Sequence, residues 1–159
     1  MADPARGSVV DDFTQAIDIF PTIIDWLGGE VPRACDGRSL GGFLTGVPLS
    51  DWRSEVFFEH DFRAVASQRV ETALGLSSDE CSYAVIRDAK YKYVHFAALP
   101  PLLFDMVADP HETTNLAGRA ELAAVELSYA QRMLSWRLEH ADRTLSNMEL
   151  TPDGLVSRP

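Results

Sequence analysis

The side chains most capable of chemistry in this sequence are the consecutive residues Glu59, His60 and Asp61. They come at the end of a β-prone stretch, residues 55–59, a place where functional groups are often found. Carboxylate and imidazole groups are metal ligands, but consecutive strand residues point to opposite faces and cannot all converge on one ion. Two interpretations remain open: an exposed polar loop, or a substrate-pocket wall to which His60 and the nearby Arg63 contribute.

The other histidines and Cys81 show no pattern of a catalytic centre. His95 is predicted on a strand face and His111 in a turn, both with structural roles. His140 falls near a helix C-terminus, where the helix dipole favours its protonation. No base is placed beside Cys81 to lower its pKa. We therefore assign no catalytic residue and no metal ligand in this chain.

Three blocks of sequence are more informative than any single residue. The first reads Asp-Ile-Phe-Pro-Thr-Ile-Ile-Asp-Trp-Leu-Gly-Gly at 18–29, followed by Asp-Gly-Arg-Ser-Leu at 36–40. The second reads Tyr-Ala-Val-Ile-Arg-Asp-Ala-Lys-Tyr-Lys-Tyr at 83–93, and the third Leu-Phe-Asp-Met-Val-Ala-Asp-Pro-His-Glu-Thr-Thr-Asn-Leu-Ala at 103–117. In this order they resemble the C-terminal part of sulfatases and phosphonate monoester hydrolases of the alkaline phosphatase-like superfamily, and the phosphonate monoester hydrolase branch most of all.

The resemblance implies a metal-dependent hydrolase of sulfate, phosphate or phosphonate monoesters whose catalytic half is missing here. Enzymes of this family hold a divalent metal, calcium or manganese, through acidic residues near their start. They oxidise a Cys or Ser within Cys/Ser-x-Pro/Ala-x-Arg to formylglycine. Cys35-Asp36-Gly37-Arg38 fails this motif, because Arg38 comes one position early and Gly37 replaces Pro or Ala. Asp11-Asp12 mimics the metal-binding pair, but we interpret it as a solvated turn.

The chain is therefore expected to be inactive alone, to carry no cofactor of its own, and to partner the N-terminal catalytic region of the same protein. Homo-oligomers are a further expected partner class. The competing hypothesis is a stand-alone, non-catalytic α+β binding module. A net charge of −10 disfavours nucleic acid and anionic membranes as partners. No apolar run is long enough to span a bilayer, residues 1–6 show no secretory pattern, and only two cysteines are present, which predicts a cytoplasmic location.

The elements that would position these residues follow from hydrophobic spacing. A helix is predicted over about 18–27, with Phe20, Ile23, Ile24 and Leu27 on one face, an Asp18 cap and a Gly28-Gly29 stop. Residues 39–45 predict a short helix. We assign residues 1–50 to the remnant of a main α/β hydrolase domain.

Residues 51–142 are predicted to form a small α+β subdomain. Its strands are expected at 55–59, 83–87, 90–96 and 102–106, in one antiparallel sheet with a tight Asp88-Ala89 turn. A long polar loop at 63–80 holds a helical turn near 68–74. A helix over 120–142 packs on the sheet through a stripe of apolar residues: Leu122, Val125, Tyr129, Met133 and Trp136. The tail, 143–159, shows no periodicity.

Overall fold

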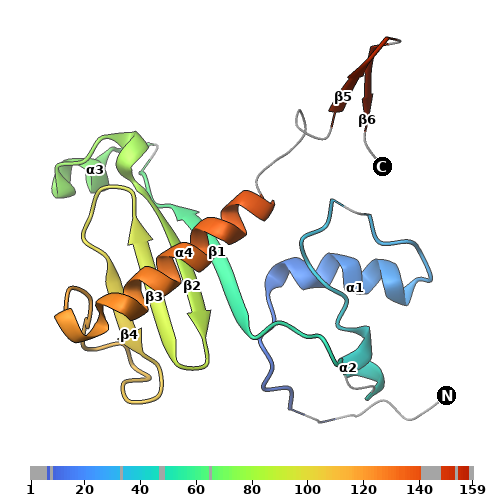
Figure 1. Cartoon of the computed structure of the whole chain (residues 1–159), viewed down its shortest axis with the longest axis horizontal. Coiled ribbons are helices and arrows are strands. Elements are labelled where there is room, and N and C mark those ends of the chain that lie inside the picture. The colour runs from blue at the N-terminus through green and yellow to red at the C-terminus, as the bar shows by residue number, and fades with distance from the viewer. Residues whose placement is uncertain are drawn as a thin grey trace.

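A four-stranded antiparallel sheet and one long helix form the core of the chain. The computed structural model describes residues 7, 9–32, 34–46, 49–64, 66–140, 148–152 and 154–157. The strands β1 (Glu55–Asp61), β2 (Ser82–Asp88), β3 (Tyr91–Phe96) and β4 (Leu102–Asp105) pair in the order β1-β2-β3-β4 (Figure 1). The predicted α+β sheet is confirmed, with strand ends shifted by one or two residues.

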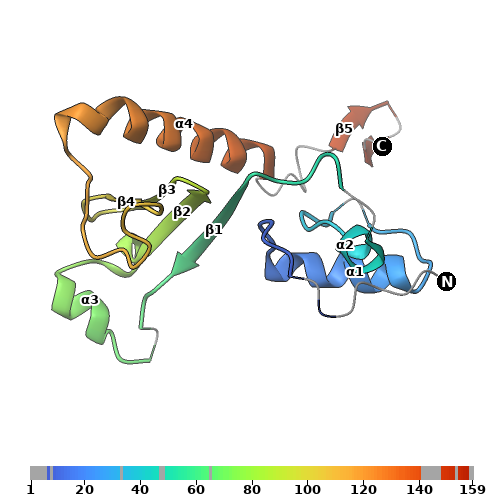
Figure 2. The same ribbon diagram turned by 90° about the horizontal axis from the view of Figure 1, so that it is seen from below.

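The long helix α4 (Ala123–His140), preceded by the 3₁₀ turn η3 (Ala120–Leu122), covers one face of this sheet (Figure 2). Tyr129 and Met133 are buried against Ile86, Tyr93 and Leu103 of the strands. Trp136, predicted on the same stripe, is only half-buried and stacks on the Phe57 ring at 4.9 Å. The predicted packing of this helix on the sheet is confirmed.

Polar contacts tie α4 to the sheet at the β2–β3 turn. The Tyr129 hydroxyl donates a 2.5 Å hydrogen bond to Asp88, and Arg132 pairs with both Asp88 and Glu55. Asp88 also accepts hydrogen bonds from the amides of Lys90 and Tyr91. Asp88 is therefore the last residue of its strand, and the turn lies at 89–90, one residue later than predicted.

The N-terminal part contains η1 (Ala16–Asp18), α1 (Ile19–Trp26) and α2 (Gly41–Thr45), close to the helices predicted there. Gly28 ends α1 with a φ of +74°, whereas Gly29 has no positive φ. The predicted cap is wrong: Asp18 makes no side-chain cap bond to α1, because its carboxylate faces other segments of the chain.

Two further regions complete the fold. The segment between β1 and β2 contains α3 (Arg69–Leu74), where a helical turn was predicted, and η2 (Ser78–Glu80). Within the tail, for which the sequence predicts no element, β5 (Met148–Thr151) and β6 (Gly154–Ser157) form an antiparallel hairpin. Strands of four residues are too short to show a periodicity. Residues 141–147 lie outside the described part, and the division at 50 and 142 stays a prediction.

Candidate functional site

One face of α1 carries a row of polar side chains that hold the segment 36–41. Asp18, Thr22 and Asp25 are spaced at i, i+4 and i+7, so they lie on the same side of the helix. Asp18 Oδ1 accepts a hydrogen bond from the Arg38 amide at 2.9 Å, and Thr22 Oγ1 accepts one from the Leu40 amide at 2.8 Å. The Ser39 hydroxyl donates to Asp25 Oδ2 at 2.5 Å. The two halves of the first sequence block are thus joined by hydrogen bonds.

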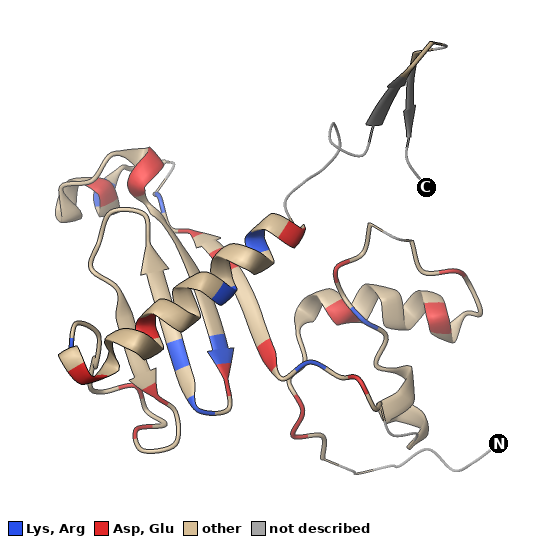
Figure 3. Ribbon diagram, in the orientation of Figure 1, with Lys and Arg blue, Asp and Glu red and all other residues tan. Residues whose placement is uncertain are grey.

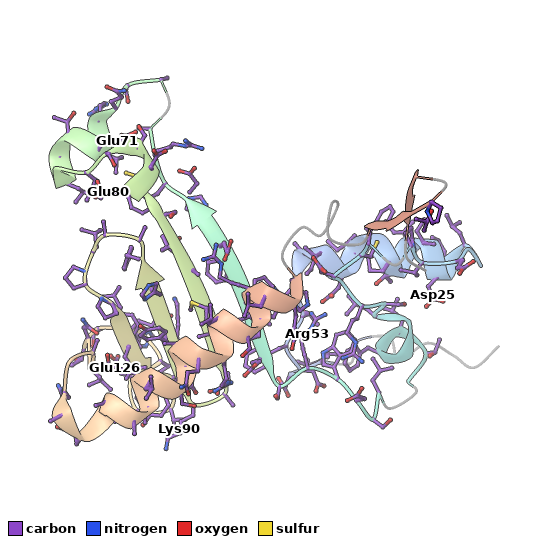
Figure 4. All side chains as sticks on the ribbon, turned by 45° about the horizontal axis from the view of Figure 1, so that its top comes forward. Asp25, Arg53, Glu71, Glu80, Lys90 and Glu126 are labelled. Carbon is purple, nitrogen blue, oxygen red and sulfur yellow. The ribbon has the colours of Figure 1, made fainter. Side chains whose placement is uncertain are left out.

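Asp18 is the most buried charge of the described part, with 0% of its surface exposed. The Arg53 guanidinium donates to both of its carboxylate oxygens, at 2.5 and 2.6 Å. The backbone N–H of Gln15 donates to Oδ2 at 2.7 Å. Burial by itself raises the pKa of Asp18, but the hydrogen bonds from Arg53, Arg38 and Gln15 outweigh burial and leave the pKa below its usual value. Figure 4 places Arg53 where the N-terminal helices meet the sheet and α4.

Gly37 is required by the same arrangement. A Cβ atom at this position would lie 2.1 Å from the carbonyl oxygen of Ile17, so only glycine allows the two backbones to come this close. The turn at 35–38 is thus explained by packing against η1. Cys35 is a free, half-buried thiol.

The Arg38 side chain packs against an aromatic ring. Its guanidinium lies 5.0 Å from the centre of the Trp52 ring, and that of Arg53 lies 4.8 Å from the same ring. The Trp52 indole donates a hydrogen bond to the Phe13 carbonyl at 2.8 Å. Trp52 thus packs in the region where the chain passes from the N-terminal helices to β1.

A hollow of about 340 Å³ lies near the end of β1, and His60 is among the residues that line it. As the strand geometry predicts, neighbouring residues diverge: Glu59 pairs with Arg137 of α4, whereas the His60 ring lies 5.5 Å from that of Tyr83 on the other face. Glu59 and Arg137 line the same hollow as His60, and the remaining lining residues are Asp61, Ser82, Tyr83, Ala84, His95 and Ala97.

Arg63 is not among the residues that line this hollow. Its side chain is 45% exposed and pairs with Asp61 at 2.7 Å. Asp61 also accepts a hydrogen bond from the Arg63 amide. The structure thus brings His60 and Arg63 to the same end of β1, and of the two only His60 is among the residues that line the hollow.

The remaining candidates take structural positions. Cys81 is fully buried, and burial, followed by the charges of Glu71 and Asp61, raises the pKa of its thiol, which keeps it protonated. His95 is exposed, with Nδ1 3.3 Å from the Tyr93 hydroxyl. His140 stacks on Trp136. Within the described ranges no three His, Cys, Asp or Glu side chains are grouped to hold a metal ion.

The third sequence block forms a tightly hydrogen-bonded turn after β4. Asp109 accepts hydrogen bonds from the Thr114 amide and the Thr113 hydroxyl, which lower the pKa of its carboxyl group. The Asn115 side-chain oxygen accepts hydrogen bonds from the backbone N–H groups of Leu103 and Ala117, and the second of these closes an Asx turn. His111 is exposed in this turn. The polar residues of the third block thus serve to hold the turn after β4 in place.

Sequence and structure comparisons agree with the order of these blocks. A family model described as N-sulphoglucosamine sulphohydrolase, C-terminal, matches residues 2–139. The chain belongs to this family. Curated relatives match most of the chain. One is the multifunctional alkaline phosphatase superfamily protein PehA of Trinickia caryophylli, 55% identical over 152 residues, or 96% of this chain and 30% of the relative. A choline-sulfatase of Rhizobium meliloti is 33% identical over 81% of this chain and 23% of its own length.

Solved structures show the same fold. The phosphonate monoester hydrolase of Agrobacterium radiobacter matches with a TM-score of 0.80 and 51% identity, over 94% of this chain and 30% of that one. The phosphonate monoester hydrolase SpPMH of Silicibacter pomeroyi matches with a TM-score of 0.83 and 38% identity, over 98% and 31%. The sulfatase-type C-terminal region described here thus spans less than a third of the length of these relatives.

Sequence reasoning missed the Asp18–Arg53 pair, the main polar contact of this C-terminal region. The spacing of Asp18, Thr22 and Asp25 on one helix face was the available signal, but it does not reveal the partner 35 residues away.

Among the described residues no helix has the length and apolar character needed to cross a bilayer.

Proposed function

We propose that this chain acts as the C-terminal region of a metal-dependent hydrolase of sulfate, phosphate or phosphonate monoesters. The observation that carries the proposal is the 55% identity to PehA over 152 residues. The TM-scores of 0.80 and 0.83 with two phosphonate monoester hydrolases support the phosphonate branch. Its partner is the N-terminal catalytic region of the same protein, to which the metal, calcium or manganese, and the formylglycine belong.

The work of this region is to complete the fold, and α1 carries that part of the proposal. Trp26 and Leu27 are 82% and 72% exposed, and Ile19, Phe20 and Ile23 are also exposed. Apolar surface of this extent on one helix is typical of an interface. The exposed side of α1 is the surface that we expect the catalytic region to cover.

A second part of the proposal places His60 and Arg63 in one wall of the substrate pocket of the whole enzyme. His60 is among the residues that line the hollow at the end of β1, and Arg63 pairs with Asp61, another residue of that lining. Both side chains can donate hydrogen bonds to an anionic ester.

The two free cysteines support a cytoplasmic location, which cell fractionation of the tagged protein would test.

A chimera tests the function directly. The C-terminal region of PehA is replaced by this chain, and the purified chimera is assayed with a phosphonate monoester and an aryl sulfate. We expect turnover within about tenfold of PehA, a difference of about 1.4 kcal/mol in barrier. PehA truncated before this region is the control and should be inactive. A folded, metal-loaded chimera without turnover would favour the stand-alone binding module instead.

The same chimera tests the pocket wall. His60→Ala and Arg63→Ala should raise KM for the ester with little change in kcat, because they remove substrate binding and leave the reacting groups in place. His111→Ala, an exposed histidine in a distant turn, is the matched control. Unchanged KM values in both wall variants would remove His60 and Arg63 from the pocket.

A further inference from the structure

Among the described residues, the N-terminal helices contribute nothing to the apolar core. All members of that core, and the partly buried side chains packed against it, lie within 57–133. Where the N-terminal helices face the sheet and α4, the structure has a second hollow, of about 350 Å³. Ile17 and Arg38 line this hollow from the side of α1, and Phe57 and Trp136 line it from the side of the sheet. The position of one part against the other therefore depends on contacts outside the core.

Those contacts involve the segment 13–18, which comes just before α1. The Phe13 ring, at one end of this segment, lies 5.9 Å from the Arg87 guanidinium of β2. At the other end, Asp18 pairs with Arg53, which comes shortly before β1. Figure 3 shows acidic and basic residues on both sides of this junction. The segment 13–18 thus contacts the N-terminal helices, the sheet and the connection between them.

Gln15 joins the two parts through its own atoms. Its backbone N–H donates to Asp18 Oδ2 at 2.7 Å, and its side-chain amide donates to the carbonyl oxygen of Phe57 in β1, also at 2.7 Å. In the described sheet, β1 is an edge strand that pairs only with β2. An edge strand lacks the second neighbour that holds an inner strand in place. The Gln15 amide supplies a contact to β1 that comes from outside the sheet.

The strand that Gln15 contacts is the one that carries the candidate pocket wall. Phe57 and His60 are three residues apart on β1, which corresponds to about 10 Å in an extended strand. A displacement of the backbone at Phe57 therefore moves His60 as well. The backbone of Gln15 is fixed to the start of α1 through Asp18, and α1 is the helix that we expect the catalytic region to cover.

We propose that Gln15 is a positioning residue, which fixes β1 relative to α1 and thereby sets His60 at its place in the substrate pocket. This inference rests on the proposed function, because it needs both the covered α1 and the pocket wall. Gln15 acts through the Phe57 carbonyl and touches no substrate. An ionised glutamate has the same shape but cannot donate a hydrogen bond, so Gln15→Glu removes the contact without leaving a gap.

Pulsed electron-spin distance measurements on the chain itself test the geometry. Spin labels at Trp26→Cys of α1 and Leu127→Cys of α4, whose side chains are 82% and 59% exposed, report the distance between the two parts. The background is Cys35→Ser, in which Cys81 remains buried and unlabelled.

Gln15→Glu should broaden the distribution of label distances, because β1 is then free to move against α1. Ser39→Ala is the matched control: it loses one side-chain hydrogen bond, to Asp25, within the N-terminal part, and should keep the wild-type distribution. Circular dichroism establishes that each variant is folded. An unchanged distribution in Gln15→Glu, or equal broadening in Ser39→Ala, would overturn the proposal whatever the activity of the enzyme.

The PehA chimera tests the effect on the pocket. Gln15→Glu should raise KM for the phosphonate monoester about as much as His60→Ala does, with little change in kcat. In the His60→Ala background the same change should alter KM by less than about twofold, because Gln15 acts through His60. A merely structural role would lower the folded fraction, and so the apparent kcat, without this dependence on His60.

The outcomes separate this inference from the proposed function. An inactive chimera would count against the proposed function, and the distance measurement would still decide whether Gln15 holds the two parts together. A chimera in which His60→Ala raises KM and Gln15→Glu does not would overturn this inference alone. An equal rise of KM in both backgrounds would show that Gln15 does not act through His60.

Discussion

Replacing Asp18 by asparagine should destabilise the N-terminal helices more than any other conservative change there. The carboxylate accepts four hydrogen bonds, from the Gln15 and Arg38 amides and twice from Arg53. An asparagine keeps one acceptor oxygen and turns an N–H group toward donors. It also leaves the Arg53 guanidinium, 12% exposed, without a counter-charge. Breaking a buried ion pair by removing one partner costs about 3–5 kcal/mol.

Urea unfolding followed by tryptophan fluorescence measures this cost, because Trp52 lies 4.8 Å from the Arg53 guanidinium and reports on its surroundings. Asp18→Asn, Arg53→Met and the double variant form a mutant cycle. The double variant should cost less than the sum of the singles by at least about 1.5 kcal/mol, since the two groups act as one unit.

Asp25→Asn is the matched control on the same helix. Its carboxylate is exposed and accepts from Ser39, so the loss should stay under about 1 kcal/mol. An unfolding midpoint of Asp18→Asn equal to that of the control would refute the reasoning. Additive costs in the cycle would also refute it.

Four further predictions concern Asp18, Gly37, the core residues of α4 and the isolated chain. Because the folded pKa of Asp18 is lowered, its contribution to stability is present above its ordinary pKa and is lost as pH falls through the folded value; acid unfolding of Asp18→Asn should therefore be less steep than that of the wild type. Gly37→Ala should cost about 1–3 kcal/mol by thermal unfolding, because its Cβ meets the Ile17 carbonyl oxygen. Met133→Ala should cost about 2–5 kcal/mol in urea unfolding, and Trp136→Ala less, because Met133 is buried and Trp136 is half-exposed. The chain alone should hydrolyse neither an aryl sulfate nor a phosphonate monoester with manganese, calcium or zinc, should show no tight divalent-metal binding, and should bind a hydrophobic dye through its exposed apolar surface.

Each of these has a contradicting result. Equal acid slopes in wild type and Asp18→Asn would show that Arg53 does not hold the carboxylate ionised. An unchanged melting temperature in Gly37→Ala would mean that the turn moves freely away from Ile17. A larger loss of unfolding free energy for Trp136→Ala than for Met133→Ala would show that Trp136, near the end of α4, contributes more to the core than Met133. Turnover by the chain alone, abolished by His60→Ala or Asp61→Ala, would overturn the assignment of catalysis to another region.

The elements that local patterns specify were predicted well. Tyr129 and Met133 recur at helical spacing, and the strands show runs of β-prone residues, so burial on one face can be read from neighbours in sequence. The errors lie where a local pattern has competing outcomes. Asp18 has the right type and place for a helix cap, but a buried arginine outcompetes the helix amides for its carboxylate. The β5–β6 hairpin depends on backbone pairing between two short strands, which has no sequence period.

The candidate site shows the same division. The sequence placed His60 at a strand end and excluded convergence of Glu59, His60 and Asp61, because strand geometry alone decides that. It could not show that Glu59, His60 and Asp61 border one hollow, because the other residues that line it come from β2, β3 and α4. Nor could it show that Arg63 pairs with Asp61.

By itself, the sequence determined the α+β class, the sulfatase-type family and the lack of a nucleophile motif, because periodicity and ordered motifs are properties of neighbouring residues. The tertiary structure alone decided that Asp18 meets Arg53, that Gly37 must lack a side chain beside Ile17, and that the leucines of α4 face away from the sheet. These features depend on distances between segments far apart in the chain. Such distances are fixed only when the whole chain packs. A buried charge and its partner, or an apolar face and the surface that covers it, can lie far apart in the sequence.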